Sequence, residues 1–195
     1  MKQNSTLIIL AGGESKRMGR PKHLLPKPDG GTLLEHLISK FSAMFTETLV
    51  VGRDLAIHNS SSVRSIEDIC LARSPLVGIY SGLVAAKTDL SFVLACDMPF
   101  VRASLVRHIL SRSSRVDVCV PVVNGYYEPL CAAYRHSAIP AIATAIERGM
   151  LKVTAPYTDL KVLTISEEEL RRFDHDLISF TNLNVPRQLE LLARL

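Results

Sequence analysis

The sequence predicts an α/β protein with three layers, whose central sheet is mostly parallel and carries an antiparallel excursion at one edge. Strand-like and helix-like segments alternate along most of the chain, which is typical of a parallel sheet covered by helices. Residues 91–95 form a short apolar run of the kind found in strands buried on both faces. Asn124-Gly125 is a strong hairpin signal, and it predicts the antiparallel excursion.

Each predicted element follows from a local pattern. The capping-box patterns Thr32-x-x-Glu35 and Ser166-x-x-Glu169 each predict the start of a helix, and Gly149 predicts an end. Apolar residues at helical spacing, and β-branched runs bounded by turn residues, supply the remaining elements. Strands are expected at residues 6–10, 48–51, 63–66, 91–95, 116–123, 126–134 and 161–165. Helices are expected at residues 33–41, 76–86, 104–110 and 137–148, after Ser166, and from Pro186 onward.

Composition narrows the class of protein. The 195 residues are 47% hydrophobic and 22% charged, which predicts a soluble fold, and we expect residues 1–195 to form a single domain. The formal charge of +4 suits an anionic ligand but is too small to indicate nucleic acid. No apolar run reaches the roughly 18 residues of a membrane span, and no export signal is evident. The four cysteines form no CxxC pair, so we expect free thiols and a cytoplasmic location.

The loop after the first predicted strand is the first place to look for a ligand, because open α/β sheets bind ligands at the carboxyl ends of their strands. Gly12 and Gly13 allow backbone amides to approach a ligand closely. Four cations follow, which a triphosphate would neutralise: Lys16, Arg17, Arg20 and Lys22. The spacing fits neither a Walker loop nor a G-x-G-x-x-G fingerprint. The alternative is a solvated basic loop whose glycines form a tight turn.

Asp97 follows the apolar run at residues 91–95, and a carboxylate in that place suits Mg²⁺, which prefers hard oxygen ligands. The alternative is that Asp97 caps the next helix. Read without further information, Asp68 is a loop aspartate, and Asn182 and Asn184 are turn or cap residues. The six histidines do not cluster, and no nucleophile elbow appears, so neither pattern supplies a general base.

Several motifs together carry a resemblance to a known family. The stretch Leu10-Ala11-Gly12-Gly13-x-Ser15-x-Arg17-Met18-Gly19-x-x-Lys22 resembles the signature loop of nucleotidyltransferases built on a Rossmann-like sheet, and its double glycine resembles the molybdenum cofactor guanylyltransferases, the MobA family. Further matching segments follow in order: Asp68 with Ser74-Pro75-Leu76-x-Gly78, Cys96-Asp97-x-Pro99, Glu128-Pro129-Leu130, and Asn182-x-Asn184. Two positions depart from the family. Ser74 replaces a glycine, and Gly52 stands where the family often has an asparagine that contacts guanosine.

The resemblance implies a Mg²⁺-dependent transfer of GMP from GTP to molybdopterin, or to the molybdenum cofactor, with release of pyrophosphate. It implies that Arg17, Lys22 and Asp97 are catalytic and that Asp97 binds the metal. Asn182 and Asn184 would contact the acceptor. The nucleotide would be bound by Leu10, Ala11, Gly12, Gly13, Lys22, Asp68 and Asp97. A molybdoenzyme or a cofactor-delivery protein is an expected partner.

The chemistry of the acceptor agrees with the absence of an evident general base. A phosphate monoester has its second pKa near ~6 and is mostly a dianion at neutral pH, so it can attack without a base. Two alternatives of the same class are a cytidylyltransferase and a sugar-phosphate nucleotidyltransferase. A different class is a non-catalytic nucleotide-binding regulatory module. An RNA-binding domain is disfavoured because no aromatic residue interleaves the basic loop.

Overall fold

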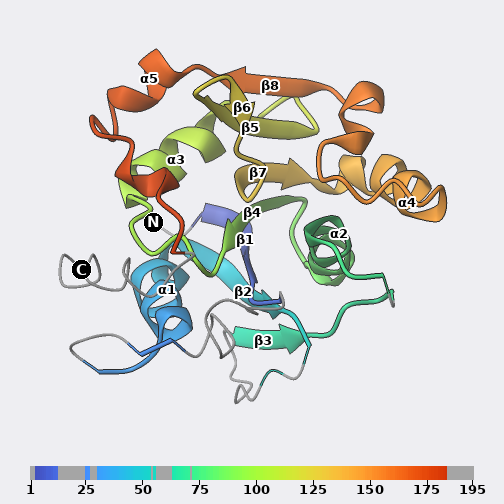
Figure 1. The fold of residues 1–195 in the computed structure, drawn as a ribbon, viewed down its shortest axis with the longest axis horizontal. Coiled ribbons are helices and arrows are strands. Elements are labelled where there is room, and N and C mark those ends of the chain that lie inside the picture. Colours follow the sequence, from blue (N-terminus) through green and yellow to red (C-terminus); the bar gives the residue numbers. More distant parts are fainter. Residues whose placement is uncertain are drawn as a thin grey trace.

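The computed structural model describes residues 3–12, 25–26, 30–53, 55, 63–70 and 72–183. Within these residues the chain forms one eight-stranded sheet (Figure 1). The strands are β1 (Gln3–Leu10), β2 (Phe45–Val51), β3 (Val63–Ile66), β4 (Leu90–Ala95), β5 (Val118–Val123), β6 (Tyr126–Tyr127), β7 (Cys131–Arg135) and β8 (Val162–Ile165). Their order is β3-β2-β1-β4-β7-β5-β6, and β8 pairs in parallel with β5 on the side opposite β7.

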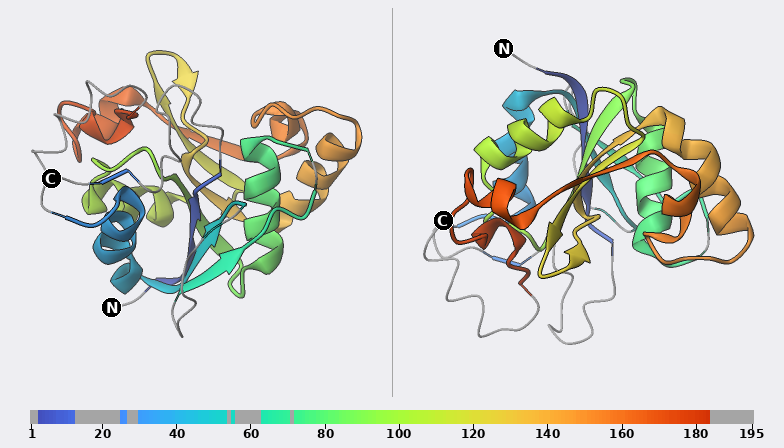
Figure 2. Two further views of the ribbon diagram at one scale, coloured as in Figure 1. Left: turned by 60° about the horizontal axis from the view of Figure 1, so that its bottom comes forward. Right: turned by 90° about the horizontal axis from the view of Figure 1, so that it is seen from above.

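Helices cover both faces of the sheet, which gives the predicted three layers (Figure 2). One face carries α1 (Leu33–Phe41) and α3 (Ala103–Arg112), and the other carries α2 (Pro75–Ala85) and α4 (Ile139–Glu147). A short helix, α5 (Glu167–Arg171), follows β8. Leu7, Ile8 and Ile9 in β1 are fully buried, as expected for a strand enclosed from both sides. The predicted fold class is confirmed.

Both predicted N-caps are present. The Thr32 hydroxyl accepts a hydrogen bond from the Glu35 amide (3.2 Å), and the Glu35 carboxylate accepts one from the Thr32 amide (2.7 Å), which completes a capping box. The Ser166 hydroxyl likewise accepts a hydrogen bond from the Glu169 amide (3.3 Å). Local sequence therefore sets the start of α1 and of α5.

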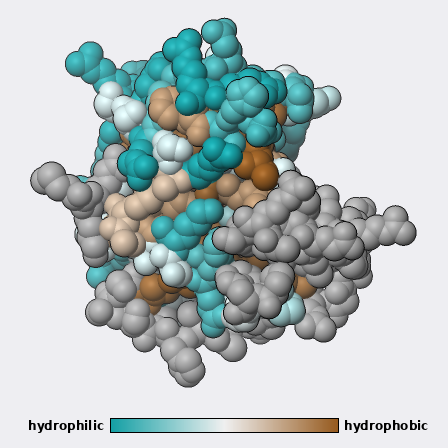
Figure 3. Space-filling model, turned by 90° about the vertical axis from the view of Figure 1, so that its left-hand side faces the viewer, coloured by the Kyte–Doolittle hydropathy of each residue, from teal (hydrophilic) through white to brown (hydrophobic). Residues whose placement is uncertain are grey.

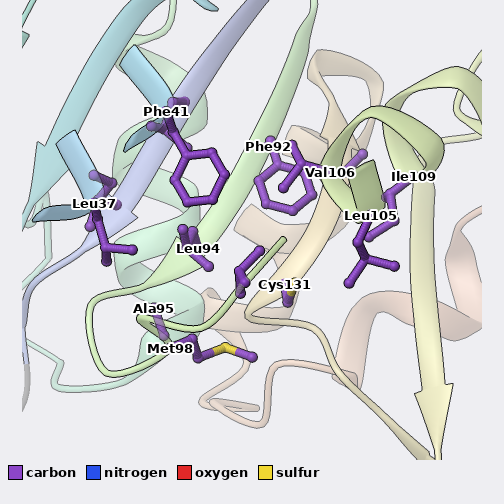
Figure 4. Close-up of a cluster of buried hydrophobic side chains, with 14 of the residues drawn as sticks. Leu37, Phe41, Phe92, Leu94, Ala95, Met98, Leu105, Val106, Ile109 and Cys131 are labelled. Carbon is purple, nitrogen blue, oxygen red and sulfur yellow. The ribbon is translucent and has the colours of Figure 1, made fainter. Parts of the chain in front are cut away.

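Two hydrophobic clusters fill the spaces between the layers. On the first face, Leu37 and Phe41 of α1 and Leu105, Val106 and Ile109 of α3 surround Phe92 and Leu94 of β4 (Figure 4). On the second face, α2 and α4 pack on the alternate residues of the same strands, among them Ile8, Val93 and Tyr134. Adjacent residues of each central strand thus serve opposite cores.

The antiparallel part of the sheet differs from the prediction in position and extent. The turn at Asn124-Gly125 is present, with φ of 51° and 79°, the left-handed geometry that a two-residue hairpin requires. The strand expected at residues 126–134 is divided into β6 and β7, because a turn closed by the Cys131 amide on the Glu128 carbonyl (3.1 Å) separates them. β7 then pairs with both β4 and β5, so this antiparallel strand lies inside the sheet and not at its edge.

The structure also bears on the cysteines and on the remaining helices. Cys96, Cys119 and Cys131 are buried free thiols, and Cys70 is a half-buried one. The helix expected from Pro186 lies outside the described residues. None of the helices in the described part of the chain has the length and apolar character needed to cross a membrane. Hydrophilic side chains gather over the upper part of the face seen in Figure 3, at the level of the charged helix α5.

Candidate active site

The carboxyl ends of four strands meet at one edge of the sheet. Leu10 is paired with Val51 on one side and with Ala95 on the other, and Val51 is paired with Ile66. Three backbone hydrogen bonds extend this alignment past the strands, from the Ala11 amide to Val51 (2.8 Å), from the Gly52 amide to Ile66 (3.1 Å) and from the Cys96 amide to Leu10 (3.0 Å). The segments that follow β1, β2 and β4 therefore leave the sheet side by side.

The start of the glycine loop rests directly on Gly52. A Cβ atom at Gly52 would lie 2.9 Å from the Gly12 nitrogen, a distance that real Cβ atoms essentially never show, and a tight 3.1 Å from the Ala11 carbonyl carbon. Glycine is therefore required here by close packing of two backbones. The departure from the expected asparagine thus has a structural reason, since any side chain would displace the loop.

Asp68 lies just beyond β3, beside the second helix. Its carboxylate is 3.6 Å from Nε of Arg53, and an ideal Cβ at Gly78 of α2 would lie 3.7 Å from its Oδ1 and 3.2 Å from Cδ2 of Leu10. Burial raises the pKa of Asp68, and the Arg53 guanidinium partly opposes that rise. Asp68 and Leu10 therefore both adjoin Gly78 on the α2 side of the edge.

Ser74 explains how the loop before α2 manages without the expected glycine. Its backbone is extended (φ −155°, ψ 155°), which any residue can adopt, and its hydroxyl accepts a hydrogen bond from the Val77 amide (3.3 Å). Pro75 then occupies the first turn of the helix. Serine thus serves as an N-cap where glycine would supply none of this side-chain bonding.

Asp97 lies in the middle of the edge and is half-buried. Its backbone carbonyl accepts a hydrogen bond from the Leu183 amide (2.9 Å), which places Asn182 next to it in space although 85 residues separate the two in sequence. The next helix, α3, begins at Ala103 and its N-cap is Arg102. Asp97 is therefore not the helix cap that the sequence offered as an alternative.

A buried aspartate helps to hold the C-terminal segment against this edge. The Asp174 carboxylate accepts a hydrogen bond from the Ser179 amide (2.8 Å) and pairs with Nε of Arg102 (3.1 Å). The Ser179 hydroxyl in turn accepts a hydrogen bond from the Arg102 amide (3.0 Å). Leu183 is fully buried in a small cluster with Leu25, Leu33 and Phe100. These contacts bring the asparagine segment to Asp97.

The structure thus gathers Leu10, Ala11, Gly12, Asp97 and Asn182 at one edge, with Asp68 beside them. The other proposed site residues lie outside the described residues: Gly13, Arg17, Lys22 and Asn184. From the sequence, Gly52 was noted only because the expected asparagine side chain is missing there, and Arg53 was not identified. The available signal for Gly52 was its position directly after a buried strand.

The donor set suits a magnesium ion bound jointly with substrate. Among the described residues no three His, Cys, Asp or Glu side chains gather into a metal cluster. Mg²⁺ commonly takes one or two protein carboxylates, with water and substrate phosphates completing its shell. A half-buried carboxylate such as Asp97, beside an edge lined by backbone groups, is compatible with that mode.

The α/β fold and the strand edge are those of a ligand-binding α/β protein, and sequence comparison gives the family. The model of the MobA-like NTP transferase domain matches residues 7–161, and the chain belongs to that family. The molybdenum cofactor guanylyltransferase of Desulfosudis oleivorans is 33% identical over 186 residues, covering 95% of this chain and 92% of the relative. A probable molybdenum cofactor guanylyltransferase of Natranaerobius thermophilus is 34% identical over 196 residues, covering 97% and 95%.

Solved structures agree with this assignment. The molybdopterin-guanine dinucleotide biosynthesis protein A of Archaeoglobus fulgidus superposes with a TM-score of 0.82 at 29% identity, covering 97% of both chains. The 2-C-methyl-D-erythritol 4-phosphate cytidylyltransferase of Thermus thermophilus gives a TM-score of 0.73 at 20% identity, covering 99% of this chain and 100% of that one. The second likeness shows that the fold is shared among nucleotidyltransferases.

Proposed function

We propose that this protein transfers GMP from GTP to the phosphate of molybdopterin, or of the molybdenum cofactor, in a Mg²⁺-dependent reaction that releases pyrophosphate. The names of the relatives suggest the substrates. The observation that carries the proposal is the convergence of three segments distant in sequence: Leu10–Gly12, Asp97 and the stretch ending in Leu183 meet through the Cys96 and Leu183 backbone hydrogen bonds. Such an edge can hold a nucleotide and an acceptor on either side of one carboxylate.

The reaction needs alignment and neutralisation of charge more than it needs a base. An oxygen of the acceptor phosphate attacks the α-phosphorus of GTP. The bond between the α-phosphorus and the oxygen that bridges the α- and β-phosphates breaks, and pyrophosphate leaves with that electron pair. The attacking phosphate is already a dianion near pH 7. The Gly12 region would present its backbone to the nucleotide, and Asp68 and Gly78 would flank it on the α2 side.

Asp97 is the residue that would hold Mg²⁺, and the bound ion would supply neutralisation of charge on the phosphates. The family resemblance assigns similar neutralisation to Arg17 and Lys22. Asn182 would lie beside the acceptor, because its neighbour Leu183 is hydrogen-bonded to Asp97.

The proposal is tested by measuring pyrophosphate release with Mg²⁺ and molybdopterin, supplying GTP or CTP, for the wild type and Asp97→Asn. We expect release with GTP, at least ~1000-fold slower in Asp97→Asn, because loss of a metal-binding carboxylate removes several kcal/mol of charge stabilisation. Asp159→Asn, an exposed aspartate near the end of the 3-10 helix at Ala155–Asp159, is the matched control and should keep full activity.

Other results would redirect or reject the proposal. Release of pyrophosphate with CTP but not with GTP would support nucleotidyl transfer with cytosine, not guanine, as the preferred nucleobase. GTP binding without pyrophosphate release would indicate a non-catalytic nucleotide-binding module.

A further inference from the structure

Arg53 lies one residue beyond Gly52, where β2 ends beside β3 (Figure 1). Its Nε atom is 3.6 Å from Oδ2 of Asp68, and its Nη2 atom donates a hydrogen bond to the Cys70 carbonyl (2.9 Å). The guanidinium therefore contacts the segment after β3 at two points, one on a side chain and one on the backbone. A planar guanidinium can reach two acceptors at once, whereas a lysine ammonium offers a single point of charge.

The same segment is also fastened to α2. The Ile69 amide donates a hydrogen bond to the hydroxyl of Ser81 (2.9 Å), which is fully buried and donates in turn to the Val77 carbonyl (2.8 Å). The Asp68 side chain lies between these two attachments, with Oδ2 toward Arg53 and Oδ1 adjoining Gly78 of α2. Its orientation therefore depends on Arg53 from the β2 side.

The charge of Arg53 acts on a carboxylate that is largely withdrawn from water. The Asp68 side chain is 15% exposed, and burial raises its pKa, while the Arg53 guanidinium opposes that rise. Glu67, the preceding residue, is exposed. Among the described residues, Arg53 is thus the charged group that favours the ionised form of Asp68.

Arg53 and Asp68 lie toward one end of the edge, away from the carboxylate that would hold the metal. In the order β3-β2-β1-β4, Asp68 follows β3, Arg53 follows β2 and Asp97 follows β4. Neighbouring strands are ~4.8 Å apart, so three strand spacings, roughly 14 Å, separate the ends of β3 and β4. A nucleotide whose phosphates lie near Asp97 and Gly12 therefore directs its nucleoside toward Arg53 and Asp68.

We propose that Arg53 is a positioning residue for nucleotide binding, which holds the Asp68 carboxylate in its orientation toward the nucleoside of GTP, a conclusion that rests on the proposed function. A fixed, ionised carboxylate accepts hydrogen bonds from the N–H and O–H groups of a nucleoside. Gly52 has no side chain to offer at the end of β2, and Arg53 supplies a polar one at the next residue. Arg53 acts through Asp68 and does not contact the phosphates.

The test is a double-mutant cycle on GTP binding, measured by calorimetry for the wild type, Arg53→Gln, Asp68→Asn and the double variant. We expect each single substitution to raise the Kd for GTP about 10-fold, the scale of one hydrogen bond to a charged group. Because Arg53 acts through Asp68, the double variant should bind at most ~2-fold more weakly than Asp68→Asn. Arg115→Gln, which changes an exposed arginine beyond α3, is the matched control.

Two further readouts distinguish positioning from other roles. The loss in Arg53→Gln should be the same for GDP as for GTP, because Arg53 is remote from the terminal phosphate. GTP binding should weaken in acid as Asp68 is protonated, and in Arg53→Gln this weakening should begin at a higher pH, because no guanidinium opposes the raised pKa of Asp68. The phosphates of GTP titrate alike with every variant, so the ratio of Kd values reports on the protein.

Arg53→Lys keeps the charge but not the planar fork, and it carries the test if Arg53→Gln fails to fold. We expect Arg53→Lys to bind GTP more weakly than the wild type at pH 7 while retaining the wild-type dependence on pH. Circular dichroism checks that each variant is folded.

Four results would overturn the inference. They are an unchanged Kd for GTP in Arg53→Gln, independent losses that multiply in the double variant, a loss larger for GTP than for GDP, and a pH dependence that Arg53→Gln leaves unchanged. The third would assign Arg53 to the terminal phosphate. A wild type that binds GTP but releases no pyrophosphate would reject only the proposed function, whereas a wild type that binds no GTP would reject both.

Discussion

Two glutamates at opposite ends of the sheet differ in the hydrogen-bond partners of their carboxylates. Glu47, near the amino end of β2, accepts hydrogen bonds from the Arg64 guanidinium (2.6 Å), the Thr6 hydroxyl (3.2 Å) and the Lys87 amide (3.1 Å). Glu128, at the carboxyl end, has none of these partners among the described residues. Burial opposes ionisation of both, but in Glu47 the hydrogen bonds from Lys87 and Arg64 overcome it and lower the pKa.

The difference separates a carboxylate that stabilises the fold from one that is available to a ligand. Glu47 joins β1, β2, β3 and the segment before β4, so its charge is compensated within the protein. Asp174 is compensated in the same way by Arg102 and Ser179. At the carboxyl end, backbones approach closely at Gly12 and Gly52, and carboxylates such as Asp68 and Glu128 have raised pKa values.

The largest effect on stability is expected for Glu47→Ala. The substitution leaves Arg64 half-buried without its carboxylate and leaves the Thr6 hydroxyl and Lys87 amide with one acceptor fewer, so we expect a loss of about 3 kcal/mol of unfolding free energy. Urea denaturation followed by circular dichroism measures it. GTP affinity of the folded protein should be unchanged. A loss below ~1 kcal/mol would contradict the structural role of Glu47.

A smaller effect, concentrated on ligand binding, is expected for Gly52→Ala. The added Cβ would press on Gly12 and Ala11, and relieving such overpacking costs about 1–3 kcal/mol. Because the loop start moves, GTP binding measured by calorimetry should weaken about 10-fold or more, which is ~1.4 kcal/mol. Gly12→Ala is the comparison, since its Cβ would be at an ordinary 3.7 Å from the nearest described atom. Equal unfolding free energies of the two variants would argue against the close contact.

The smallest effect is expected for the stability of Glu128→Gln, and its sign is opposite to that of Glu47→Ala. The raised pKa of Glu128 means that its ionised form opposes folding at pH 7, so the neutral glutamine should stabilise by at most about 1 kcal/mol. The wild type gains the same stability as the pH falls, first through the raised pKa of Glu128 in the folded protein and then through its pKa in the unfolded chain. The difference in unfolding free energy between the wild type and Glu128→Gln, measured by denaturation, should therefore disappear toward pH 4.

The stability of the Glu47 network follows the reverse pH course. Because the pKa of Glu47 is lowered in the folded protein, its contribution to stability is complete above its pKa in the unfolded chain. That contribution is lost as the pH falls through its pKa in the folded protein. Unfolding free energies of wild type and Glu47→Ala should therefore converge in acid. If Glu128→Gln were less stable than the wild type at pH 7, as is expected for Glu47→Ala, and this difference disappeared in acid, the two glutamates would not differ as described.

Most individual elements were predictable because their signals are local. The Thr32–Glu35 capping box fixes the start of α1, and Asn124-Gly125 fixes a left-handed turn. β3 begins and ends as predicted, at Val63 and Ile66. The split between β6 and β7 was missed because Glu128-Pro129-Leu130 lies between two apolar runs without a glycine to mark the turn.

The sequence by itself determined the alternation of strands and helices, the glycine loop after the first strand and the positions of Asp68, Asp97 and Asn182 along the chain. Only the tertiary structure decided which of these meet, because strand order and long-range contacts are set by packing between distant segments. It placed β7 inside the sheet, laid Gly12 on Gly52 and joined Leu183 to Asp97. It also left Glu128 without a described partner beside Tyr126, a difference in environment that no residue type reveals.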